Sequence, residues 1–342
     1  MSTTDTRAVE RSADEVLVWS RDLLDPALRA AVDRLPAAMR HISGYHFGWW
    51  DERGEPIHAR AGKAVRPALV LLCAEAAGGE AAEALPAAVA VELVHNFSLL
   101  HDDVMDGDTT RRHRPTAWSV FGTSAAILAG DALLSLAMEI LAPGGAAGVR
   151  ALSTATLELL EGQSEDLEFE RRTEVLPDEC ARMAMGKTGA LIGSACALGG
   201  LAVGGRPELV KRFGLFGRSL GLAFQHVDDL LGIWGDPEVT GKPVFSDLQN
   251  RKKSLPVVAA LASGADGMRE LACLYAQELP LSAPQLARAA ELVELAGGRT
   301  WSRSQADLLL AEAMQHLAVA NPSPRPGAEL AALARLLTHR SR

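Results

Sequence analysis

Two long apolar segments that each end in paired aspartates limit what this chain can fold into. The first covers residues 87–106 and contains Asp102, Asp103 and Asp106. The second covers residues 221–236 and contains Asp228 and Asp229. A spacing of four places two carboxylates one turn apart on one helix face, where they repel each other unless a cation neutralises them. Oxygen ligands suit Mg²⁺ that also holds phosphate. We therefore expect two helix ends that face each other and bind magnesium.

The spacing of apolar residues predicts an all-α protein, a single large helical bundle. Apolar residues make up 48% of the chain and aromatic residues only 5%, and the abundance of Ala and Leu favours helix over sheet. We expect a frayed polar segment over residues 1–12 and one domain over residues 13–342. The expected helices cover residues 13–42 with breaks near Pro26 and Pro36, then about 67–79, 82–105, 123–141, 149–172, 177–204 and 207–235, with more helices to 337. Residues 44–61 read as a packed connector rather than a partner surface.

The bulk properties exclude several classes of protein. A net charge of −9 and a pI near 5.5 argue against nucleic acid as a partner. The four cysteines are scattered without a paired spacing, which is typical of reduced core residues in a cytoplasmic protein. The first fifteen residues lack the apolar core of a signal peptide, and we find no uncharged apolar run of 18 residues. We expect a cytoplasmic protein without stable membrane insertion.

Basic and polar motifs accompany the aspartates in a characteristic order, and the chain resembles the trans-type polyprenyl diphosphate synthase family. The matching segments are GKAVRP (62–67), VHNFSLLHDDVMDGDTTRRHRPT (94–116), EGQSEDL (161–167), GKTGAL (186–191), FQHVDDLLGIWGD (224–236), TGKP (240–243) and KKSLP (252–256). The resemblance implies a homodimeric prenyltransferase that uses three Mg²⁺ ions. Its substrates would be isopentenyl diphosphate and an allylic diphosphate.

The resemblance also implies a role for each matching residue. Isopentenyl diphosphate would be bound by Lys63, Arg66, His95 and Arg112. The allylic diphosphate would be bound by Arg111, Lys187, Lys242 and Lys252, with Gln163 near the metal cluster, and the metal ligands would be Asp102, Asp103, Asp106, Asp228 and Asp229. Thr188 and Gln225 would face the allylic cation. From the residues alone, Lys63 and Arg66 precede a helix N-terminus, which favours anions, and Lys187 lies in an uncharged run where it needs an anion.

This chain departs from the family pattern at four positions. Ala64 stands where the family often has another arginine, and His113 stands where it commonly has glycine. Phe245 also replaces a common glycine. Gly232 replaces the usual fifth aspartate of the second motif, and we expect Asp236 to compensate in part.

The length of the product depends on which residue closes the bottom of the pocket that holds the growing prenyl chain. In this family the residue five before the first motif often forms the floor, and here it is Phe97, with Ser98 leaving space beside it. Ideal helix geometry instead turns Phe97 away from Asp102, so a floor on the helix at 123–141 is the alternative. A floor at Phe97 predicts geranylgeranyl diphosphate, with farnesyl diphosphate next.

Two further readings compete with chain elongation. A terpene cyclase on the same fold would keep the aspartates and dispense with the isopentenyl diphosphate site. A non-catalytic partner subunit would tend to lose the aspartate pairs. The presence of both residue sets favours an elongating enzyme.

Overall fold

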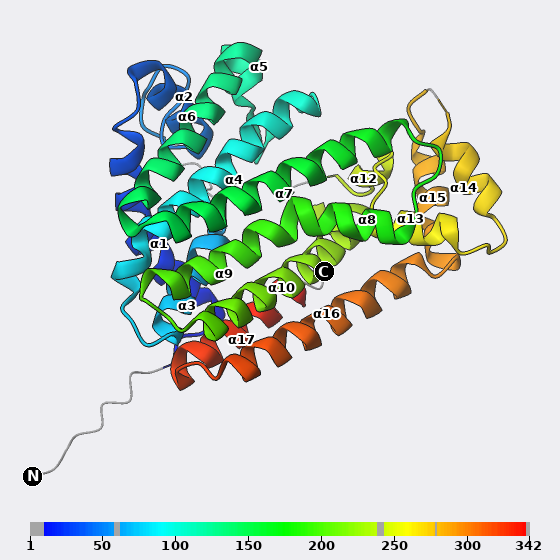
Figure 1. Ribbon diagram of the computed structural model, residues 1–342. Helices are drawn as coiled ribbons and strands as arrows, with labels where there is room; N and C mark the ends of the chain where they lie inside the picture. Colours follow the sequence, from blue (N-terminus) through cyan, green and yellow to red (C-terminus); the bar gives the residue numbers. More distant parts are fainter. Residues whose placement is uncertain (1–9, 58–61, 238–242, 278, 340–342) are drawn as a thin grey trace, which may run out of the picture. The chain divides into compact units, whose positions relative to one another are not determined.

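The computed structural model describes residues 10–57, 62–237, 243–277 and 279–339, and these residues are helical almost throughout (Figure 1). The longer helices are α1 Ala13–Val32, α2 Ala37–Phe47, α3 Val65–Ala76, α4 Leu85–Met105, α6 Thr123–Leu141, α7 Ala146–Arg171, α8 Pro177–Ala184, α9 Ala190–Ala202, α10 Pro207–Trp234, α13 Leu255–Ala262, α14 Met268–Tyr275, α15 Ala283–Leu295, α16 Gly298–Ala320 and α17 Pro324–Thr338. Short elements are η1 Ala81–Ala84, β1 Thr110–Arg111, β2 Arg114–Pro115, α5 Ala117–Phe121, η2 Ala142–Gly144, η3 Met185–Gly189 and α12 Ser246–Gln249. The expectation of an all-α protein is confirmed.

The chain divides into two compact units. The first comprises residues 1–153, 194–214 and 317–333, and the second comprises residues 154–193, 215–316 and 334–342. Several helices contribute residues to both: α7, α9, α10, α16 and α17. The expectation of one domain over residues 13–342 stays a prediction, and residues 1–9 of the segment expected to fray lie outside the described residues.

The first unit is organised around α4, which packs mainly against α6 and α3. An ion-pair cluster ties its distant chain segments together: Arg11 contacts both Glu75 and Glu329, and Arg325 contacts the same two carboxylates. In the second unit the end of α10 packs with α12, α13, α14 and α15 around Ile233, Leu248 and Val257. Each aspartate motif therefore ends a helix that is anchored in the core of its own unit.

Two helices are long and apolar enough to cross a membrane by length and composition. The segment Ala81–Met105 is 67% buried inside the protein, as a core helix is. Thr123–Gly144 is only 39% buried, and its α6 part exposes Ile127 and Leu128 by 39% and 52%. Both segments contain charged residues, so neither of them is an uncharged apolar run. Ile127 and Leu128 thus form an apolar surface on α6 that the described residues of this unit leave exposed.

The N-terminal region corrects one expected boundary. The predicted break at Pro36 is confirmed, but α1 continues through Pro26 without a break. Proline removes one helical hydrogen bond, yet the buried face of α1 continues past it at Leu24 and Leu28. Packing on both sides of the proline thus keeps the helix intact. Helix α2 continues to Phe47 and so includes the start of the expected connector, where Tyr45 and Phe47 are buried. Beyond Gly48 the described part of the connector is less packed than expected, because residues 52–56 are exposed.

Candidate active site

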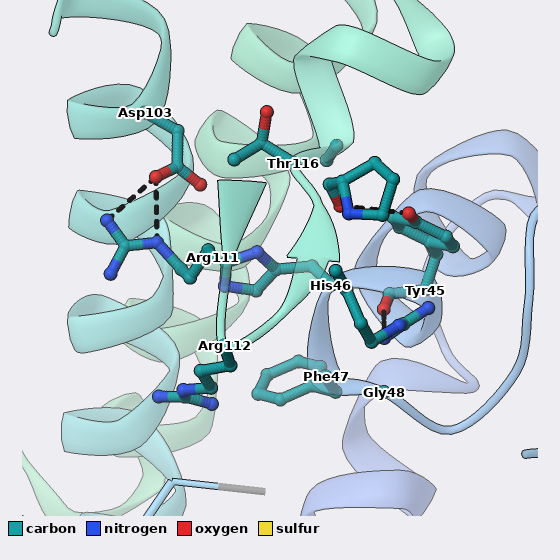
Figure 2. A pocket seen from close by; sticks show the side chains of 11 residues that line it. Tyr45, His46, Phe47, Gly48, Asp103, Arg111, Arg112 and Thr116 are labelled. Carbon is teal, nitrogen blue, oxygen red and sulfur yellow. Dashed lines mark hydrogen bonds and ion pairs between the residues drawn. The ribbon is translucent and has the colours of Figure 1, made fainter. Parts of the chain in front are cut away.

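At the end of α4 in the first unit, the three aspartates differ in how deeply they are buried. Asp103 is 1% exposed, and the Nε and Nη2 atoms of Arg111 each lie 2.7 Å from its Oδ1 (Figure 2). Burial raises the pKa of Asp103 to about 6, although Arg111 pulls it down. Asp102 is half-buried and Asp106 is exposed. Asp103 therefore holds Arg111 in place, while Asp102 and Asp106 are more accessible than Asp103.

A tight hairpin replaces the expected loop after this motif. Strands β1 and β2 pair through Thr110–Pro115 and Arg111–Arg114, so Arg112 and His113 form the turn with φ of 51° and 62°. Turns with two left-handed residues favour Asn and Gly, so this pair is strained. The turn directs Arg112 away from Asp103 (Figure 2). A Cβ on Gly62 would lie 2.5 Å from Nη2 of Arg112, so the arginine rests against the backbone of the GKAVRP motif.

The start of α3 adds a second cation to the same place. Nη1 of Arg66 lies 3.3 Å from Nε2 of His95 on α4, and Nε of Arg66 has no hydrogen-bond partner among the described residues. Arginine can only donate, so Nε2 of His95 is the acceptor. Burial, with repulsion from Arg66 and Arg112, lowers the pKa of His95 well below its usual value, which keeps the ring neutral. Arg66, His95 and Arg112 thus form a basic cluster, and Lys63 is exposed beside it.

The small cavity beside the hairpin combines predicted site residues with side chains that the sequence did not single out. Figure 2 shows Tyr45 and His46 from α2 on one side and Asp103 with Arg111 on the other. Arg114 lies 4.4 Å over the Tyr45 ring and donates to the carbonyl oxygens of Tyr45 and Trp50. Arg114 is therefore a brace that fixes the hairpin to the end of α2.

In the second unit, too, the second aspartate of the pair is buried and lies beside a cation. Asp229 is 3% exposed and accepts hydrogen bonds from Nε2 of Gln225 at 2.8 Å and from the Leu255 N–H at 2.9 Å. Nζ of Lys252 lies 3.7 Å from its Oδ1. Burial raises the pKa of Asp229 to about 6 against the attraction of Lys252. Asp228 is half-buried and lines a cavity of about 150 Å³ with Lys187 and Lys252. In both motifs the second aspartate is buried beside a cation and the first is half-buried.

Lys187 lies in the π-helical turn η3 that interrupts the expected helix at 177–204. Its Nζ is 2.6 Å from Oδ2 of Asp166, a residue that the sequence reasoning missed although it lies three residues after Gln163. The Thr188 hydroxyl donates to Oε1 of Gln225 at 2.6 Å. Gln163 is buried, and neither of its side-chain polar atoms has a partner among the described residues. The cavity of the second unit is therefore lined by both lysines and aspartates, and Gln163 is a buried amide on the neighbouring α7.

The missing fifth aspartate of the second motif is matched by a residue from another segment. A Cβ on Gly232 would lie 2.3 Å from Oδ2 of Asp247, so the buried Asp247 carboxylate occupies the space that a side chain at position 232 would need. Asp236, the expected replacement, is exposed. Phe245 has a φ of 65° just before α12, where a glycine would be unstrained. Lys242 lies outside the described residues.

The two residues assigned to product length lie on α4 but differ in their contacts. Phe97 is 3% exposed, and its ring packs edge-to-face on His101 with centroids 4.8 Å apart. Ser98 is buried and donates to the His95 carbonyl oxygen of its own helix. The Phe97 ring is therefore a packed part of α4, and the Ser98 hydroxyl is turned back onto the backbone.

The carboxylate set fits a hard cation that takes few ligands from the protein. Among the described residues, no three His, Cys, Asp or Glu side chains are grouped closely enough to hold a metal ion alone. Mg²⁺ usually keeps several waters and binds through one or two carboxylates together with substrate phosphates. The cavity of the second unit offers carboxylate oxygens of Asp166, Asp228 and Asp229, which are such ligands. The residues present thus fit magnesium brought together with a diphosphate, and they do not resemble a closed structural metal site.

Comparison with known proteins gives one consistent result. A family model described as polyprenyl synthetase matches residues 49–292. The chain is 48% identical to the (2E,6E)-farnesyl diphosphate synthase of Mycobacterium tuberculosis, over 98% of this chain and 96% of that protein. It is 46% identical to a geranylgeranyl diphosphate synthase of the same organism, over 92% of this chain and 90% of that protein.

Solved structures agree with the sequence relatives. The crystal structure of a polyprenyl synthetase from Streptomyces coelicolor matches with a TM-score of 0.91 and 46% identity, covering 94% of this chain and 98% of that one. A geranylgeranyl pyrophosphate synthetase from Pyrococcus horikoshii matches with a TM-score of 0.85 and 31% identity, covering 96% and 99%.

Proposed function

This chain belongs to the polyprenyl synthetase family and is a prenyltransferase, and we propose that it joins isopentenyl diphosphate head to tail to an allylic diphosphate, giving geranylgeranyl diphosphate. Farnesyl diphosphate is the second candidate product, because a relative at 48% identity carries that name. The observation that carries the proposal is the basic cluster of Arg66, His95 and Arg112 in the unit that also holds Asp102. An elongating enzyme needs a diphosphate site for the second substrate in addition to its metal carboxylates.

The carboxylates divide into two roles in this proposal. Asp102 and Asp106 in the first unit and Asp228 in the second would hold magnesium ions, for which we propose a total of three, and these ions would bind the allylic diphosphate. Bound magnesium supplies neutralisation of the diphosphate leaving group. Asp103 and Asp229 instead hold Arg111 and Lys252, so that their positive charges stay fixed where negative charge develops.

The side chains of the second unit serve the allylic substrate. Lys187, Lys252 and Lys242 bind its diphosphate, and the buried amide of Gln163 offers a hydrogen bond near the metals. The hydroxyl of Thr188 donates to Gln225. The lone pairs of the Thr188 oxygen therefore stay available to stabilise the allylic cation. Isopentenyl diphosphate, held by Lys63, Arg66, His95 and Arg112, attacks that cation. The departing diphosphate takes the proton that is lost in the final elimination.

A single assay distinguishes chain elongation from the competing functions. Incubation with Mg²⁺, isopentenyl diphosphate and each allylic diphosphate in turn, followed by mass spectrometry, identifies products that are longer by units of five carbons. A cyclised hydrocarbon made without isopentenyl diphosphate would instead establish a terpene cyclase. Absence of any product from every primer would support a non-catalytic partner subunit and contradict the proposal.

The basic cluster predicts a selective kinetic defect. Arg112→Ala and Lys63→Ala should raise the Michaelis constant for isopentenyl diphosphate about tenfold to a hundredfold, because each removes a charge-assisted contact worth about 1.5–3 kcal/mol. The constant for the allylic diphosphate should stay near the wild-type value. Steady-state kinetics with one substrate varied at a time provides the measurement. A rise in the allylic constant instead would show that the two diphosphate sites are assigned wrongly.

We also propose a cytoplasmic homodimer. The apolar face of α6 exposes Ile127 and Leu128, and a second copy of the chain would cover it. Light scattering should give twice the mass of 36.2 kDa at micromolar concentration, and Leu128→Glu should shift the mass toward one chain by burying a charge in the interface. A monomer in the wild-type protein would contradict the proposal.

A further inference from the structure

A row of polar side chains leads from α2 to the basic cluster and involves residues that the proposed mechanism does not use. Nε2 of His46 lies 3.1 Å from Oδ1 of Asn96, and Nδ2 of Asn96 lies 3.0 Å from Oε1 of Glu92. The same Nδ2 also donates to the Glu92 carbonyl oxygen at 2.8 Å. Asn96 is almost completely buried. His46, Asn96 and Glu92 therefore form a continuous hydrogen-bonded row inside the first unit.

The direction of each hydrogen bond in this row is fixed. The two acceptors at Glu92 require the NH₂ group of Asn96 to point toward them, so Oδ1 of Asn96 must accept from His46. Nε2 of His46 then carries the ring proton. Burial, with repulsion from Arg111 and Arg112, lowers the pKa of His46 to about 3, so the ring stays neutral and keeps this tautomer. The row has one consistent arrangement, and it holds Glu92 by an acceptor oxygen.

Glu92 is placed to act on the arginines of the basic cluster. On α4, Glu92 and His95 are three residues apart and share a face with Asn96, and His95 contacts Arg66. Burial raises the pKa of Glu92, and attraction by Arg66, followed by the Asn96 hydrogen bond and Arg112, opposes that rise. The Glu92 carboxylate thus lies near enough to attract both guanidinium groups, and its negative charge offsets the repulsion between them.

We propose that Glu92 is a positioning residue for the isopentenyl diphosphate site: held by Asn96 and through it by His46, its carboxylate keeps the guanidinium groups of Arg66 and Arg112 where the diphosphate binds. The proposal rests on the proposed function, since it assigns the basic cluster to that substrate. Preorganised donors bind an anion without first paying for their own ordering. The role of Glu92 is to fix the donors, and it does not touch the substrate.

Glu92→Gln tests the proposal because it removes the charge and keeps the shape. The glutamine oxygen can still accept from Asn96, but the side chain no longer carries the negative charge that offsets the repulsion between the two guanidinium groups, so they move apart. Direct titration with isopentenyl diphosphate in a calorimeter should show affinity about tenfold weaker or more, because the lost charge no longer holds the two arginines in place for the diphosphate. The Michaelis constant for isopentenyl diphosphate should rise to match, with kcat and the allylic constant near wild type.

Two further variants make the result specific. Glu92→Asp keeps the charge but draws the carboxylate back by about one C–C bond, roughly 1.5 Å, so it should bind isopentenyl diphosphate better than Glu92→Gln and more weakly than the wild type. Glu75→Gln is the matched control. Glu75 also lies between two arginines of the first unit, 2.5 Å from Nη2 of Arg11 and 3.1 Å from Nη2 of Arg325, at the other end of α3. Its loss should lower thermal stability and leave both Michaelis constants unchanged.

The outcomes separate clearly. Unchanged or tighter binding of isopentenyl diphosphate by Glu92→Gln overturns the proposal, and so does a parallel rise of both Michaelis constants with lost stability, which would indicate a merely structural role. If Glu92→Gln does not fold, Glu92→Asp with wild-type affinity overturns it as well. Failure of the wild-type protein to bind isopentenyl diphosphate would instead refute the proposed function itself, because that measurement does not involve Glu92.

Discussion

We expect Asp102→Ala and Asp228→Ala each to lower kcat by several orders of magnitude while the protein stays folded. Each variant removes a carboxylate from the open side of its motif, where neutralisation of the leaving diphosphate supplies much of the barrier reduction. The loss should fall on turnover, since ionisation of the allylic substrate precedes bond formation. Single-turnover measurements with saturating Mg²⁺ and both substrates provide the rate, and circular dichroism with thermal melting checks the fold.

Asp236→Ala is the matched control for this prediction. Asp236 follows the second motif but is exposed, and the buried Asp247 carboxylate already occupies the space beside Gly232. Its removal should leave kcat within about threefold of wild type, as is usual for an exposed residue outside the site. Near-wild-type turnover in Asp102→Ala or Asp228→Ala would refute the assignment of magnesium to both motifs.

The parts of the fold that depend on local pattern could be predicted well. The helix at 123–141 was expected with the bounds that the structure gives, and the second motif helix was expected to 235 and ends at Trp234. Both have long apolar periods with a clear end. Because helix formation and its hydrophobic face depend on neighbours within a few residues, a single sequence contains the necessary information. The motif aspartates could be located for the same reason.

The parts that depend on distant partners could not be predicted. Lys187 pairs with Asp166 across 21 residues, and Asp229 accepts from the Leu255 backbone across 26 residues. Nothing in local spacing indicates that the second aspartate of each motif is buried on a cation and the first is not. Likewise, Arg112 and His113 occupy a strained turn that their residue types disfavour. Such a turn persists only because surrounding contacts such as the Arg114 brace hold it.

We expect Phe97→Ala to change the product rather than the rate, shifting it from twenty carbons to longer chains. The Phe97 ring packs on His101, whose Nε2 lies 3.0 Å from the Ile127 carbonyl oxygen of α6. A Cβ on Gly130 of α6 would lie 2.4 Å from the same atom, so His101 fits there only because Gly130 has no side chain. His101 thus contacts both of the positions that the sequence suggested for the bottom of the pocket, Phe97 and the helix at 123–141.

The expected increase in product length is large because burying the prenyl chain of the product contributes a large favourable free energy. Each added unit brings five carbons, and burying them contributes about 4 kcal/mol at about 0.8 kcal/mol per CH₂ group. A pocket deepened by loss of the ring therefore favours at least one further condensation before release. Chromatographic sizing of the products with each allylic primer is the measurement. Phe213→Leu, which trims a fully buried ring elsewhere in the same unit, controls for loosened packing and should leave product length unchanged. An unchanged product from a folded, active Phe97→Ala enzyme would place the floor away from Phe97, and a product change in Gly130→Ala, which displaces His101, would then locate it on α6.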